Sequence, residues 1–462
     1  MLNFNIDKSE YKNVHFIGIG GISMSGLAEI LLNKGYKVTG SDMNDSKLIH
    51  KLNKKGANIR IGHEAQNVIG SDLVVYTSAI NENNPEYKYA IDNNVPLMDR
   101  ATFLGELMKA YKDSIAVAGT HGKTTTTGMI ASILNHSELN STILLGGELD
   151  SIGGNVKIGG TELLLTEACE YRGNFLKFYP TIGIILNIDE DHLDFFNGID
   201  DIKDTFKKFI DIIPDSGYVI VNGEDENINS LIEKNKKNFI TFGLANSNNY
   251  YANNIEYTDK GYPSYDLYIN EDYIDRINLN VVGKHNIYNS LSAIASSNIA
   301  GVKIESIKSG LEIYKGTHRR FEDKGIIKGI QVVDDYAHHP TEIKATLESV
   351  GKKYNKVWCI FQPHTYTRTK SLLKEFSQSF TGADEVIVTD IYAAREKDTG
   401  LVHSKDLVTE IANNNINSKY IKTFEEVIDY LEKNVDKGDI LITMGAGDVY
   451  KIGDMFKEKF IL

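Results

Sequence analysis

One short segment of this chain combines the residue types that bind the phosphates of a nucleoside triphosphate. It follows an apolar run at 114–118 that is typical of a β-strand, and it leads into a threonine-rich helix start. In such a loop, glycines let backbone N–H groups approach phosphate oxygens, a lysine binds the outer phosphates, and a hydroxyl contributes to a magnesium site. The loop residues expected to contact the triphosphate are Gly119, Thr120, His121, Gly122, Lys123, Thr124 and Thr125.

The general phosphate-loop pattern is only partly met, because Val117 stands where the full consensus has a glycine. A threonine-rich helix start after a strand is the simpler interpretation. It leaves two glycines and a lysine at these spacings unexplained, so the use of a nucleoside triphosphate is the favoured prediction.

Acidic and imidazole side chains follow the two apolar strands that come after this loop. Glu167 lies just past the run at 162–165, and His192 lies in an acidic segment past the run at 181–186. Carboxylate oxygens and one imidazole can hold Mg²⁺ or Mn²⁺ that bridges phosphates. With the hydroxyl of Thr124 they form a predicted metal site, whereas Asp189, Glu190 and Asp194 are interpreted as facing solvent.

A glycine-rich turn lies near the N-terminus, between a predicted strand at 14–17 and a predicted helix at 25–34. It resembles a dinucleotide-binding fingerprint, and Asp42 at the end of the next strand is placed to bind ribose hydroxyls. The third fingerprint glycine is replaced by Ser23, and such a turn can also serve only close helix–strand packing. Because a triphosphate loop follows, a nucleotide-like substrate in the first domain fits better than a hydride-transfer cofactor.

Polar residues also gather in the last third of the chain, after predicted strands at 330–334 and 357–361. His338 and His339 are adjacent, but no cysteine or third histidine lies at zinc-ligand spacing. Substrate contact, or capping of the next helix by His339, is therefore favoured over a zinc site. Arg368 is predicted to clamp a carboxylate or a phosphate.

Two amides mark the start of another predicted helix. Asn286 and Asn289 lie three residues apart, hence on one face of that helix. Amides in this position can pair with a purine or a ribose, and by spacing alone helix capping explains them equally well.

The elements around these motifs predict an α/β protein of three domains. Strands alternate with helices in residues 1–108, in 109–313 and again in 314–462, which favours parallel sheets. The first and last domains are expected to be Rossmann-like, and the central one to have the parallel sheet of a phosphate-loop ATPase. The segment 245–280, with short alternating runs rich in Tyr and Asn, predicts an antiparallel excursion from the central domain.

The composition excludes some kinds of partner. The formal net charge of −13 leaves no basic excess with which to bind a nucleic acid. No apolar run approaches the roughly 20 residues of a membrane span, so no membrane insertion is expected. The N-terminus has no signal-peptide pattern, and the 462 residues include only two cysteines, which favours a cytoplasmic protein.

Taken together, the motifs resemble those of the Mur ligase family, the ATP-dependent enzymes that build the peptide of bacterial peptidoglycan. Gly-Thr-His-Gly-Lys-Thr-Thr-Thr, Glu-Ala-Cys-Glu-Tyr-Arg, Asn-Ile-Asp-Glu-Asp-His and Gly-Lys-His-Asn occur in the family order, at 119–126, 167–172, 187–192 and 283–286. The similarity extends over essentially the whole chain. In this comparison the valine before the phosphate loop is a family trait.

Within the family, the segments at 18–26, 319–322, 334–343 and 361–368 are similar to those of members that add L-alanine. The resemblance implies ligation of L-alanine to the lactyl carboxylate of UDP-N-acetylmuramate, through an acyl phosphate that ATP provides. The alternative within the family is a muropeptide-recycling ligase, which joins a ready-made tripeptide to the same sugar nucleotide.

The resemblance also assigns roles to individual residues. To the ATP-binding loop it adds four residues: Asn286, Asn289, Arg320 and Asp335. The residues implied to bind the UDP-sugar are Gly18, Gly20, Gly21, Ile22, Ser23, Ser41, Asp42 and Ser78. Those implied to shape the alanine site are Tyr336, His338 and Arg368, and those implied to hold Mg²⁺ or Mn²⁺ are Thr124, Glu167 and His192. The implied catalytic set is Lys123, Glu167, His192, His338 and Arg368.

Two functions from other classes are alternatives to a ligase. A nucleotide-driven switch would hydrolyse ATP without a sugar nucleotide, and it gives no reason for the motif at 334–343. A Rossmann-type oxidoreductase would require bound NAD or NADP. The protein is expected to be a monomer or a weak homodimer.

Overall fold

The computed structural model describes residues 4, 6, 10–232, 235–350 and 353–461. Its contacts divide the chain into two compact units. Unit 1 comprises Met1–Ile188, Asp200–Tyr251 and Ser290–Gly310, and unit 2 comprises Asp189–Ile199, Ala252–Asn289 and Leu311–Leu462. No helix among the described residues is long and apolar enough to cross a lipid bilayer.

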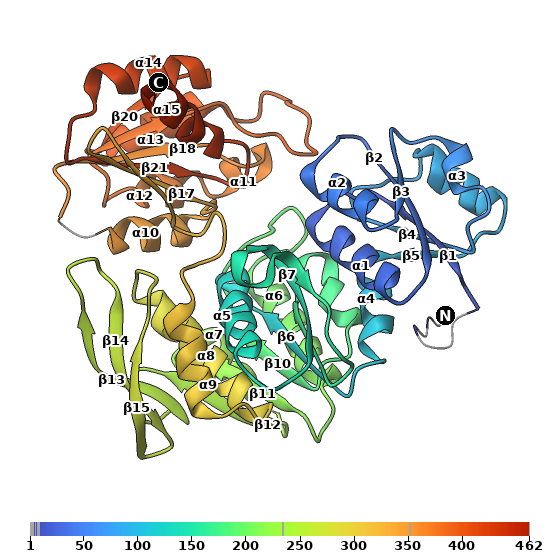
Figure 1. The fold of residues 1–462 in the computed structure, drawn as a ribbon. Coiled ribbons are helices and arrows are strands. Elements are labelled where there is room, and N and C mark those ends of the chain that lie inside the picture. The colour runs from blue at the N-terminus through green and yellow to red at the C-terminus, as the bar shows by residue number, and fades with distance from the viewer. Residues whose placement is uncertain (1–3, 5, 7–9, 233–234, 351–352, 462) are drawn as a thin grey trace. The chain divides into compact units, whose positions relative to one another are not determined.

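Unit 1 begins with a five-stranded sheet in the order β3-β2-β1-β4-β5, in which every pairing is parallel (Figure 1). The strand order reverses between β1 and β4, so the carboxyl ends of these two strands border a crevice, the usual ligand position in an open parallel sheet. Its strands are β1 (Asn13–Ile17), β2 (Lys37–Asp42), β3 (Asn58–Ile61), β4 (Leu73–Tyr76) and β5 (Leu97–Asp99). Its helices are α1 (Ile22–Asn33), α2 (Lys47–Lys54), α3 (Pro85–Asp92) and α4 (Arg100–Met108), with a short 3₁₀ turn η1 (Ala65–Val68).

Local sequence signals start several of these helices. The side chains of Ser46, Asn84 and Asp99 cap α2, α3 and α4 by accepting hydrogen bonds from first-turn backbone N–H groups. Such caps satisfy donors that have no partner inside the helix. Pro85 follows its cap at the first helical position, where a missing N–H costs nothing.

The second sheet of unit 1 runs in the order β12-β11-β10-β6-β9-β7-β8, and only the β7–β8 pairing is antiparallel. Because β6 lies between β10 and β9, the loops that follow these three strands meet at one edge of the sheet. The strands are β6 (Asp113–Ala118), β7 (Ser141–Leu149), β8 (Gly154–Lys157), β9 (Leu163–Glu167), β10 (Ile182–Ile185), β11 (Tyr218–Asn222) and β12 (Asn238–Gly243). The helices are α5 (Lys123–Asn135), α6 (Ile199–Ile212) and α7 (Glu226–Ile232), with 3₁₀ turns η2 (Asp150–Ile152) and η3 (Tyr171–Lys177).

An antiparallel excursion follows, as the alternating runs predict. Strand β13 (Tyr250–Tyr257) is followed by β14 (Pro263–Ile269) and β15 (Asp272–Asn278), which pair antiparallel. Two helices then complete this part of the chain: α8 (His285–Ile299) and α9 (Ile304–Ile313).

The rest of unit 2 is a six-stranded sheet in the order β16-β17-β21-β18-β19-β20, with only β16 antiparallel. Its strands are β16 (Glu322–Ile327), β17 (Ile330–Asp335), β18 (Val357–Phe361), β19 (Glu385–Val388), β20 (Asn417–Tyr420) and β21 (Ile440–Met444). Its helices are α10 (Pro340–Ser349), α11 (Tyr366–Ser371), α12 (Leu373–Gln378), α13 (Ser404–Asn413), α14 (Phe424–Asn434) and α15 (Tyr450–Ile461).

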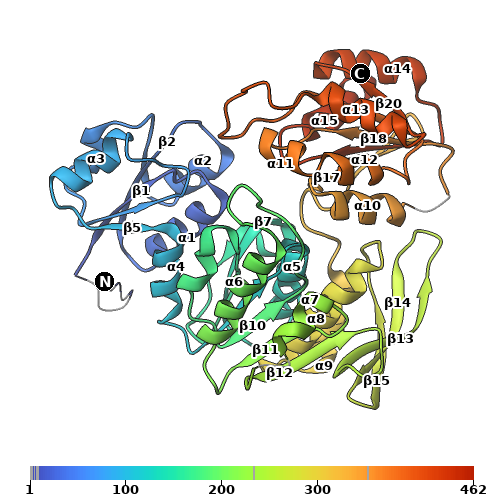
Figure 2. The ribbon, with the colours of Figure 1, turned by 180° about the vertical axis from the view of Figure 1, so that it is seen from behind.

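Helices cover both faces of this sheet, so successive residues along a strand pack into apolar cores on opposite faces. Cys359 and Phe361 pack with residues of α10, α12 and α13, whereas Trp358 and Ile360 pack with residues of α14 and α15. The two helical layers are visible on either side of the sheet from the front and from behind (Figure 1, Figure 2). Burial on both faces explains why the strand at 357–361 is apolar at every position.

The α/β class, the two flanking parallel sheets and the antiparallel excursion are confirmed. Helices α11 and α12 are separate because Leu372 between them leaves helical geometry and lies in the apolar core. The edge strand β20 is not predicted from its sequence, since Asn-Ser-Lys-Tyr has no apolar run.

Candidate active site

The phosphate loop is shaped by two glycines in the left-handed region. Gly119 directly after β6 has a φ of 133°, and Gly122, with a φ of 86°, is the N-cap of α5. A Cβ at Gly119 would lie 2.9 Å from the Leu186 side chain and 3.2 Å from the backbone nitrogen of Asn187. Conformation and space therefore both require a glycine at 119, and the turn presents the N-terminus of α5.

Lys123 is held against the loop by its own ammonium group. Nζ donates to the carbonyls of Gly119 and Thr120, the latter at 3.0 Å, and lies 3.2 Å from a carboxylate oxygen of the buried Glu170. The lysine is thus only partly exposed and its charge is paired. The residue motif does not predict this partner, although Glu170 belongs to the Glu-Ala-Cys-Glu-Tyr-Arg segment.

A second contact ties the loop to the end of β10. The backbone N–H of His121 donates to Oδ1 of Asn187 at 2.8 Å, and the amide of Asn187 donates back to the His121 carbonyl at 3.1 Å. This reciprocal pair fixes the backbone on the N-terminal side of α5.

The structure brings together two of the three predicted metal ligands. The hydroxyl of Thr124 donates to Oε2 of Glu167 at 3.0 Å, and the N–H of Gly146 donates to Oε1 at 2.6 Å. A Cβ at Gly146 would lie 2.7 Å from both carboxylate oxygens, so a larger residue here would displace the Glu167 carboxylate. A hydroxyl and a carboxylate in contact at a helix N-terminus form a hard-oxygen donor set that suits Mg²⁺. The third predicted ligand, His192, belongs to unit 2.

The glycine turn after β1 is also in contact with the predicted partner at the end of β2. Gly18 has a φ of 82° and donates to the carbonyl of Ser41 at 2.8 Å, and Gly20 donates to Oδ2 of Asp42 at 2.9 Å. A Cβ at Gly18 would lie 2.6 Å from Thr77, the residue after β4. The predicted residues thus lie at the crevice between β1 and β4, and Ser78, which follows Thr77, is exposed there.

Ser41 has a different environment from the other residues assigned to this site. Its side chain is fully buried, and its hydroxyl donates to the buried Glu86 at 2.5 Å and lies 2.9 Å from Nδ1 of His63. Its backbone carbonyl, in contrast, supports the glycine turn. The buried position indicates that Ser41 acts from behind the turn, through a polar network centred on Glu86.

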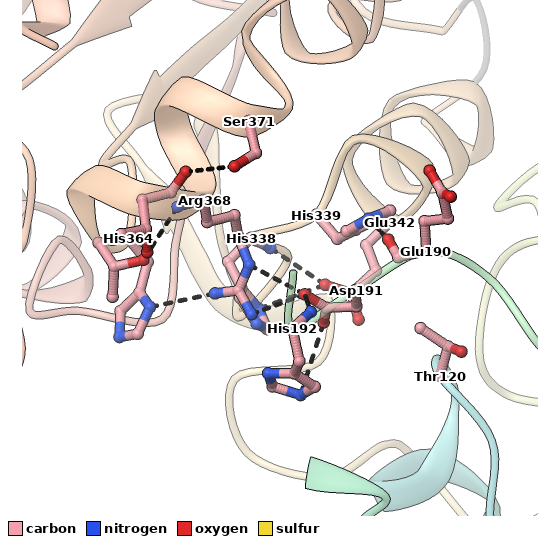
Figure 3. Close-up of polar contacts among 12 residues, drawn as sticks. Thr120, Glu190, Asp191, His192, His338, His339, Glu342, His364, Arg368 and Ser371 are labelled. Atoms are coloured by element: carbon pink, nitrogen blue, oxygen red, sulfur yellow. Dashed lines mark hydrogen bonds and ion pairs between the residues drawn. The ribbon is translucent and has the colours of Figure 1, made fainter. Parts of the chain in front are cut away.

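In unit 2, the segment Asp189–Ile199 contributes a buried carboxylate to the cluster drawn in Figure 3. Asp191 accepts hydrogen bonds from Nε and Nη2 of Arg368 at 3.1 and 2.8 Å, both at Oδ1. Nη1 of the same arginine lies 3.2 Å from Nδ1 of His364. Burial alone would raise the pKa of Asp191, but the interactions with Arg368 and with the neighbouring histidines together outweigh burial and hold that pKa well below its usual range. The predicted clamp is therefore in contact with a carboxylate that the sequence does not identify.

His338 is a neutral imidazole in this cluster. Its Nδ1 lies 3.0 Å from the Tyr336 carbonyl and its backbone N–H donates to Glu342 at 3.1 Å. Burial lowers the pKa of His338 to about 3. Because a carbonyl only accepts, Nδ1 carries the proton and Nε2 is left as a lone-pair acceptor. Burial and the Arg368 charge likewise lower the pKa of His364 to about 4.

These residues line a cavity of about 140 Å³. All three predicted amino-acid-binding residues contribute to it, together with the predicted metal ligand His192, which adopts a left-handed backbone with a φ of 53°. His364 is a further lining residue that sequence reasoning left without a role; its place in the Phe-Gln-Pro-His segment after β18 is the only signal for it. The other lining residues include Asp191, Thr365, Arg395 and Glu396.

Asp335 and Arg320 are two further residues predicted to bind ATP. Among the described residues, no hydrogen bond joins their side chains. Asp335 is buried at the end of β17 and accepts from the backbone N–H groups of Phe321 and Ala337 at 3.0 and 2.7 Å. Burial raises the pKa of Asp335 to about 6. The guanidinium of Arg320 lies 5.0 Å from the centre of the Tyr336 ring. Asp335 thus orders the two backbone segments that carry Arg320 and Tyr336.

The two predicted adenine-side amides contact each other. Asn286 donates to the carbonyl of Val282 at 2.7 Å and accepts from the amide of Asn289 at 3.0 Å, and both side chains are buried. The pairing orders the first turn of α8.

His339 is confirmed as a helix cap. Its side chain accepts from the N–H of Thr341, and Pro340 occupies the first turn of α10. Nε2 of His339 also lies 2.9 Å from the carbonyl of Glu190. The two neighbouring histidines therefore differ, since His339 holds a backbone in place while His338 lines the cavity.

Comparisons with known proteins agree with one another. Three family models match the chain: "Mur ligase family, catalytic domain" over residues 13–112, "Mur ligase middle domain" over 117–297 and "Mur ligase, glutamate ligase domain" over 319–447. Among curated proteins, UDP-N-acetylmuramate–L-alanine ligase of Clostridium acetobutylicum is 52% identical over 460 residues, covering 99% of this chain and 100% of that protein. The protein of the same name from Caldanaerobacter subterraneus is 51% identical over 98% of this chain and 99% of its own length.

Two solved structures are similar over nearly the full length. The UDP-N-acetylmuramate–alanine ligase of Thermotoga maritima matches with a TM-score of 0.82 and 29% identity, over 97% of this chain and 99% of that one. A murein peptide ligase from Psychrobacter arcticus matches with a TM-score of 0.72 and 25% identity, over 96% and 98% of the two chains.

Proposed function

The chain belongs to the Mur ligase family, and we propose that it joins L-alanine to the lactyl carboxylate of UDP-N-acetylmuramate with the consumption of ATP. The observation that carries this proposal is the identity of about half of all residues, over essentially the full length, to curated ligases of that name. The products are UDP-N-acetylmuramoyl-L-alanine, ADP and phosphate, and the reaction serves peptidoglycan precursor synthesis.

The recycling ligase, which takes a tripeptide in place of alanine, is less well supported. The murein peptide ligase structure is 25% identical to this chain, against 52% for the alanine ligase of C. acetobutylicum.

The reaction needs an activated carboxylate, because a free carboxylate is a poor electrophile. A lactyl oxygen takes the γ-phosphoryl group of ATP and ADP leaves; the alanine nitrogen then attacks the acyl carbon and phosphate leaves. Lys123 and the N-terminus of α5 neutralise phosphate charge, and their contribution lies in positioning and charge stabilisation. The carbonyls that bind Nζ hold the lysine ready beside the loop.

Thr124 and Glu167, with His192, would hold a divalent cation, Mg²⁺ or Mn²⁺. The direct hydrogen bond between the hydroxyl and the carboxylate supports this proposal, because the two oxygen donors lie 3.0 Å apart. A cation bound there supplies neutralisation of the charge on the phosphoryl oxygens. The N–H of Gly146 keeps Glu167 turned to this point by binding its other oxygen.

The amino acid is proposed to bind in the cavity of unit 2. Arg368 presents a guanidinium that suits the alanine carboxylate, and Tyr336 supplies a wall of the cavity. The alanine ammonium must lose a proton before its nitrogen can attack. His338 lines this cavity and keeps an unprotonated Nε2, which can accept a hydrogen bond from the alanine ammonium group.

Further properties are proposed on the same basis. The domains are 1–108 for the UDP-sugar, 109–313 for ATP and 314–462 for the amino acid. In addition to the loop residues, the residues proposed to bind ATP are Asn286, Asn289, Arg320 and Asp335. The protein acts in the cytoplasm as a monomer or weak homodimer, without a nucleic-acid partner.

Phosphate release tests the proposed function directly. With ATP, Mg²⁺, UDP-N-acetylmuramate and L-alanine all present, we expect steady release, and omission of either the sugar nucleotide or alanine should abolish it. Replacement of L-alanine by the L-Ala-D-Glu-diamino acid tripeptide should give no ligation. Release that persists without the sugar nucleotide would overturn the ligase assignment in favour of a nucleotide-driven switch.

The metal proposal has its own test. Glu167→Gln should move the Mg²⁺ concentration for half-maximal phosphate release upward by roughly tenfold or more, because a neutral amide binds a hard cation weakly. Glu162→Gln, which changes an exposed carboxylate just before the same strand, is the matched control and should leave the Mg²⁺ dependence unchanged. Equal Mg²⁺ curves for the two variants would remove Glu167 from the ligand set.

A further inference from the structure

Arg100 is a cation in a position where helices favour anions. It is the first residue of α4, directly after the N-cap Asp99. The N-terminus of a helix carries a partial positive charge, so a guanidinium there is electrostatically unfavourable. Local rules are broken in this way mainly where function requires it.

The guanidinium is also poorly compensated by the protein. Arg100 is only partly exposed, and Nη1 donates to the hydroxyl of Ser23 at 3.1 Å. In the part of the chain that the structure describes, no carboxylate forms an ion pair with it. The adjacent Asp99 is engaged elsewhere, by the hydroxyl of Thr102 at 2.6 Å and by Lys177 at 2.9 Å.

Burial acts on this group as expected for an unpaired charge. Burial lowers the pKa of Arg100, while the negative charges of Asp99 and Glu167 act in the opposite direction. The guanidinium keeps its proton in any case, since arginine does not deprotonate in proteins. A charged group that is withdrawn from water without a partner is costly, and an anionic ligand would remove that cost.

The surroundings indicate which anion this is. Ser23 belongs to the glycine turn assigned to the sugar nucleotide, and Glu167 belongs to the phosphate-loop site. Arg100 therefore contacts the first site and lies within electrostatic reach of the second. The substrate that must extend between these two sites is UDP-N-acetylmuramate, whose anionic groups are its diphosphate and its lactyl carboxylate.

We propose that Arg100 binds an oxyanion of the sugar nucleotide and so holds this substrate between the glycine turn and the phosphate loop. The proposal rests on the proposed function, because it takes the sugar nucleotide as the substrate. One of the five guanidinium N–H donors contacts Ser23, and the planar fork of the group suits bidentate binding of a phosphate or carboxylate.

Direct binding measurements test the proposal. By calorimetry, Arg100→Ala should weaken UDP-N-acetylmuramate binding by about 10- to 100-fold, the range typical of a lost charge-assisted contact. Arg100→Lys should recover part of the loss, because it keeps the charge but not the fork. Lys88→Ala, which removes an exposed cation from α3, is the control and should bind the sugar nucleotide as the wild type does.

UDP-N-acetylglucosamine identifies the oxyanion, because it carries the same diphosphate but no lactyl carboxylate. An equal loss of affinity for both sugar nucleotides assigns Arg100 to the diphosphate, and a loss confined to UDP-N-acetylmuramate assigns it to the carboxylate. Unchanged affinity for both would overturn the proposal.

A purely structural role predicts a different pattern. If Arg100 only orients the turn through its hydrogen bond, Ser23→Ala should lose as much affinity as Arg100→Ala, and the double variant should lose no more; that result would also overturn the proposal. In kinetics, the KM for the sugar nucleotide should rise in Arg100→Ala while the KM for ATP stays constant. Failure of the proposed function is separate, since it would appear in the wild type as phosphate release that ignores the sugar nucleotide.

Discussion

Charged residues in the candidate site are mostly held by partners from the same unit. Lys123 contacts Glu170, Glu167 contacts Thr124, and Arg368 contacts Asp191. Each contact lowers the cost of keeping a charge partly out of water and fixes the side chain near the position where it is used. Arg100 is the exception, and for that reason it carries the inference on the sugar nucleotide.

Asp335 gives a prediction at the residue scale. Burial raises its folded-state pKa to about 6, above the usual 3.8. The folded chain therefore binds the proton more tightly, so the stabilising effect is complete below about pH 4 and is lost as the pH rises through about 6. Relative to Asp335→Asn, the wild type should lose stability between pH 4 and pH 6, with little further change above pH 7.

Trp358 is a convenient probe for this measurement. It is the only tryptophan and lies buried in β18, in the same sheet as Asp335. Urea unfolding followed by its fluorescence at a series of pH values reports the stability of this part of the chain. Asp323→Asn, at an exposed position, is the control. A constant difference between wild type and Asp335→Asn across the series would contradict the prediction.

At the scale of elements, close backbone approach decides where glycine is required. Gly105 lies in the middle of α4, and a Cβ there would fall 1.9 Å from the carbonyl oxygen of Lys177 in η3. Gly453 lies in α15, where the nearest atom to a Cβ is a Val332 methyl at 3.5 Å. Helix propensity alone predicts the same effect of a glycine-to-alanine substitution at both positions, but the packing around the two positions differs.

These two glycines form a matched pair. Gly453→Ala should stabilise the protein by up to about 1 kcal/mol, because alanine has the higher helix propensity. Gly105→Ala should destabilise it by about 1–3 kcal/mol or more, because α4 must move away from η3. Thermal unfolding followed by circular dichroism measures both shifts. A Gly105→Ala variant as stable as Gly453→Ala would show that the α4–η3 contact is looser than described.

At the scale of the whole molecule, the proposed ATP loop and the sugar-nucleotide turn lie in unit 1, on different sheets. The loop follows β6, whereas the turn follows β1. Two separate sites predict two separable binding events, each of which stabilises the folded chain by mass action.

Ligand-induced thermal shifts test this separation. In the wild type, a non-hydrolysable ATP analogue with Mg²⁺ and UDP-N-acetylmuramate should each raise the unfolding temperature, since a ligand at 100 times its Kd adds about 2.7 kcal/mol. Lys123→Ala should lose the shift caused by the ATP analogue and keep the shift caused by the sugar nucleotide. Loss of both shifts in a folded variant would mean that the two sites are not independent.

The α/β class, the motifs and most element positions can be predicted from the amino-acid sequence, because each depends on residues that are neighbours along the chain. Strand runs such as 357–361, helix caps such as His339 and the phosphate loop are all local signals. The roles of single residues came from the family resemblance, and most remain predictions that the experiments above address.

Which charged side chains contact one another could not be predicted and became known from the folded chain. Asp191 and Arg368 are 177 residues apart, and nothing near either residue in the sequence identifies its partner. The same holds for the burial of Ser41 against Glu86, for the carbonyl that excludes a side chain at Gly105, and for the lack of an ion pair at Arg100 within the described residues. The physical reason is that local propensity acts over a few residues, whereas desolvation and pairing depend on which distant segments the folded sheets bring together.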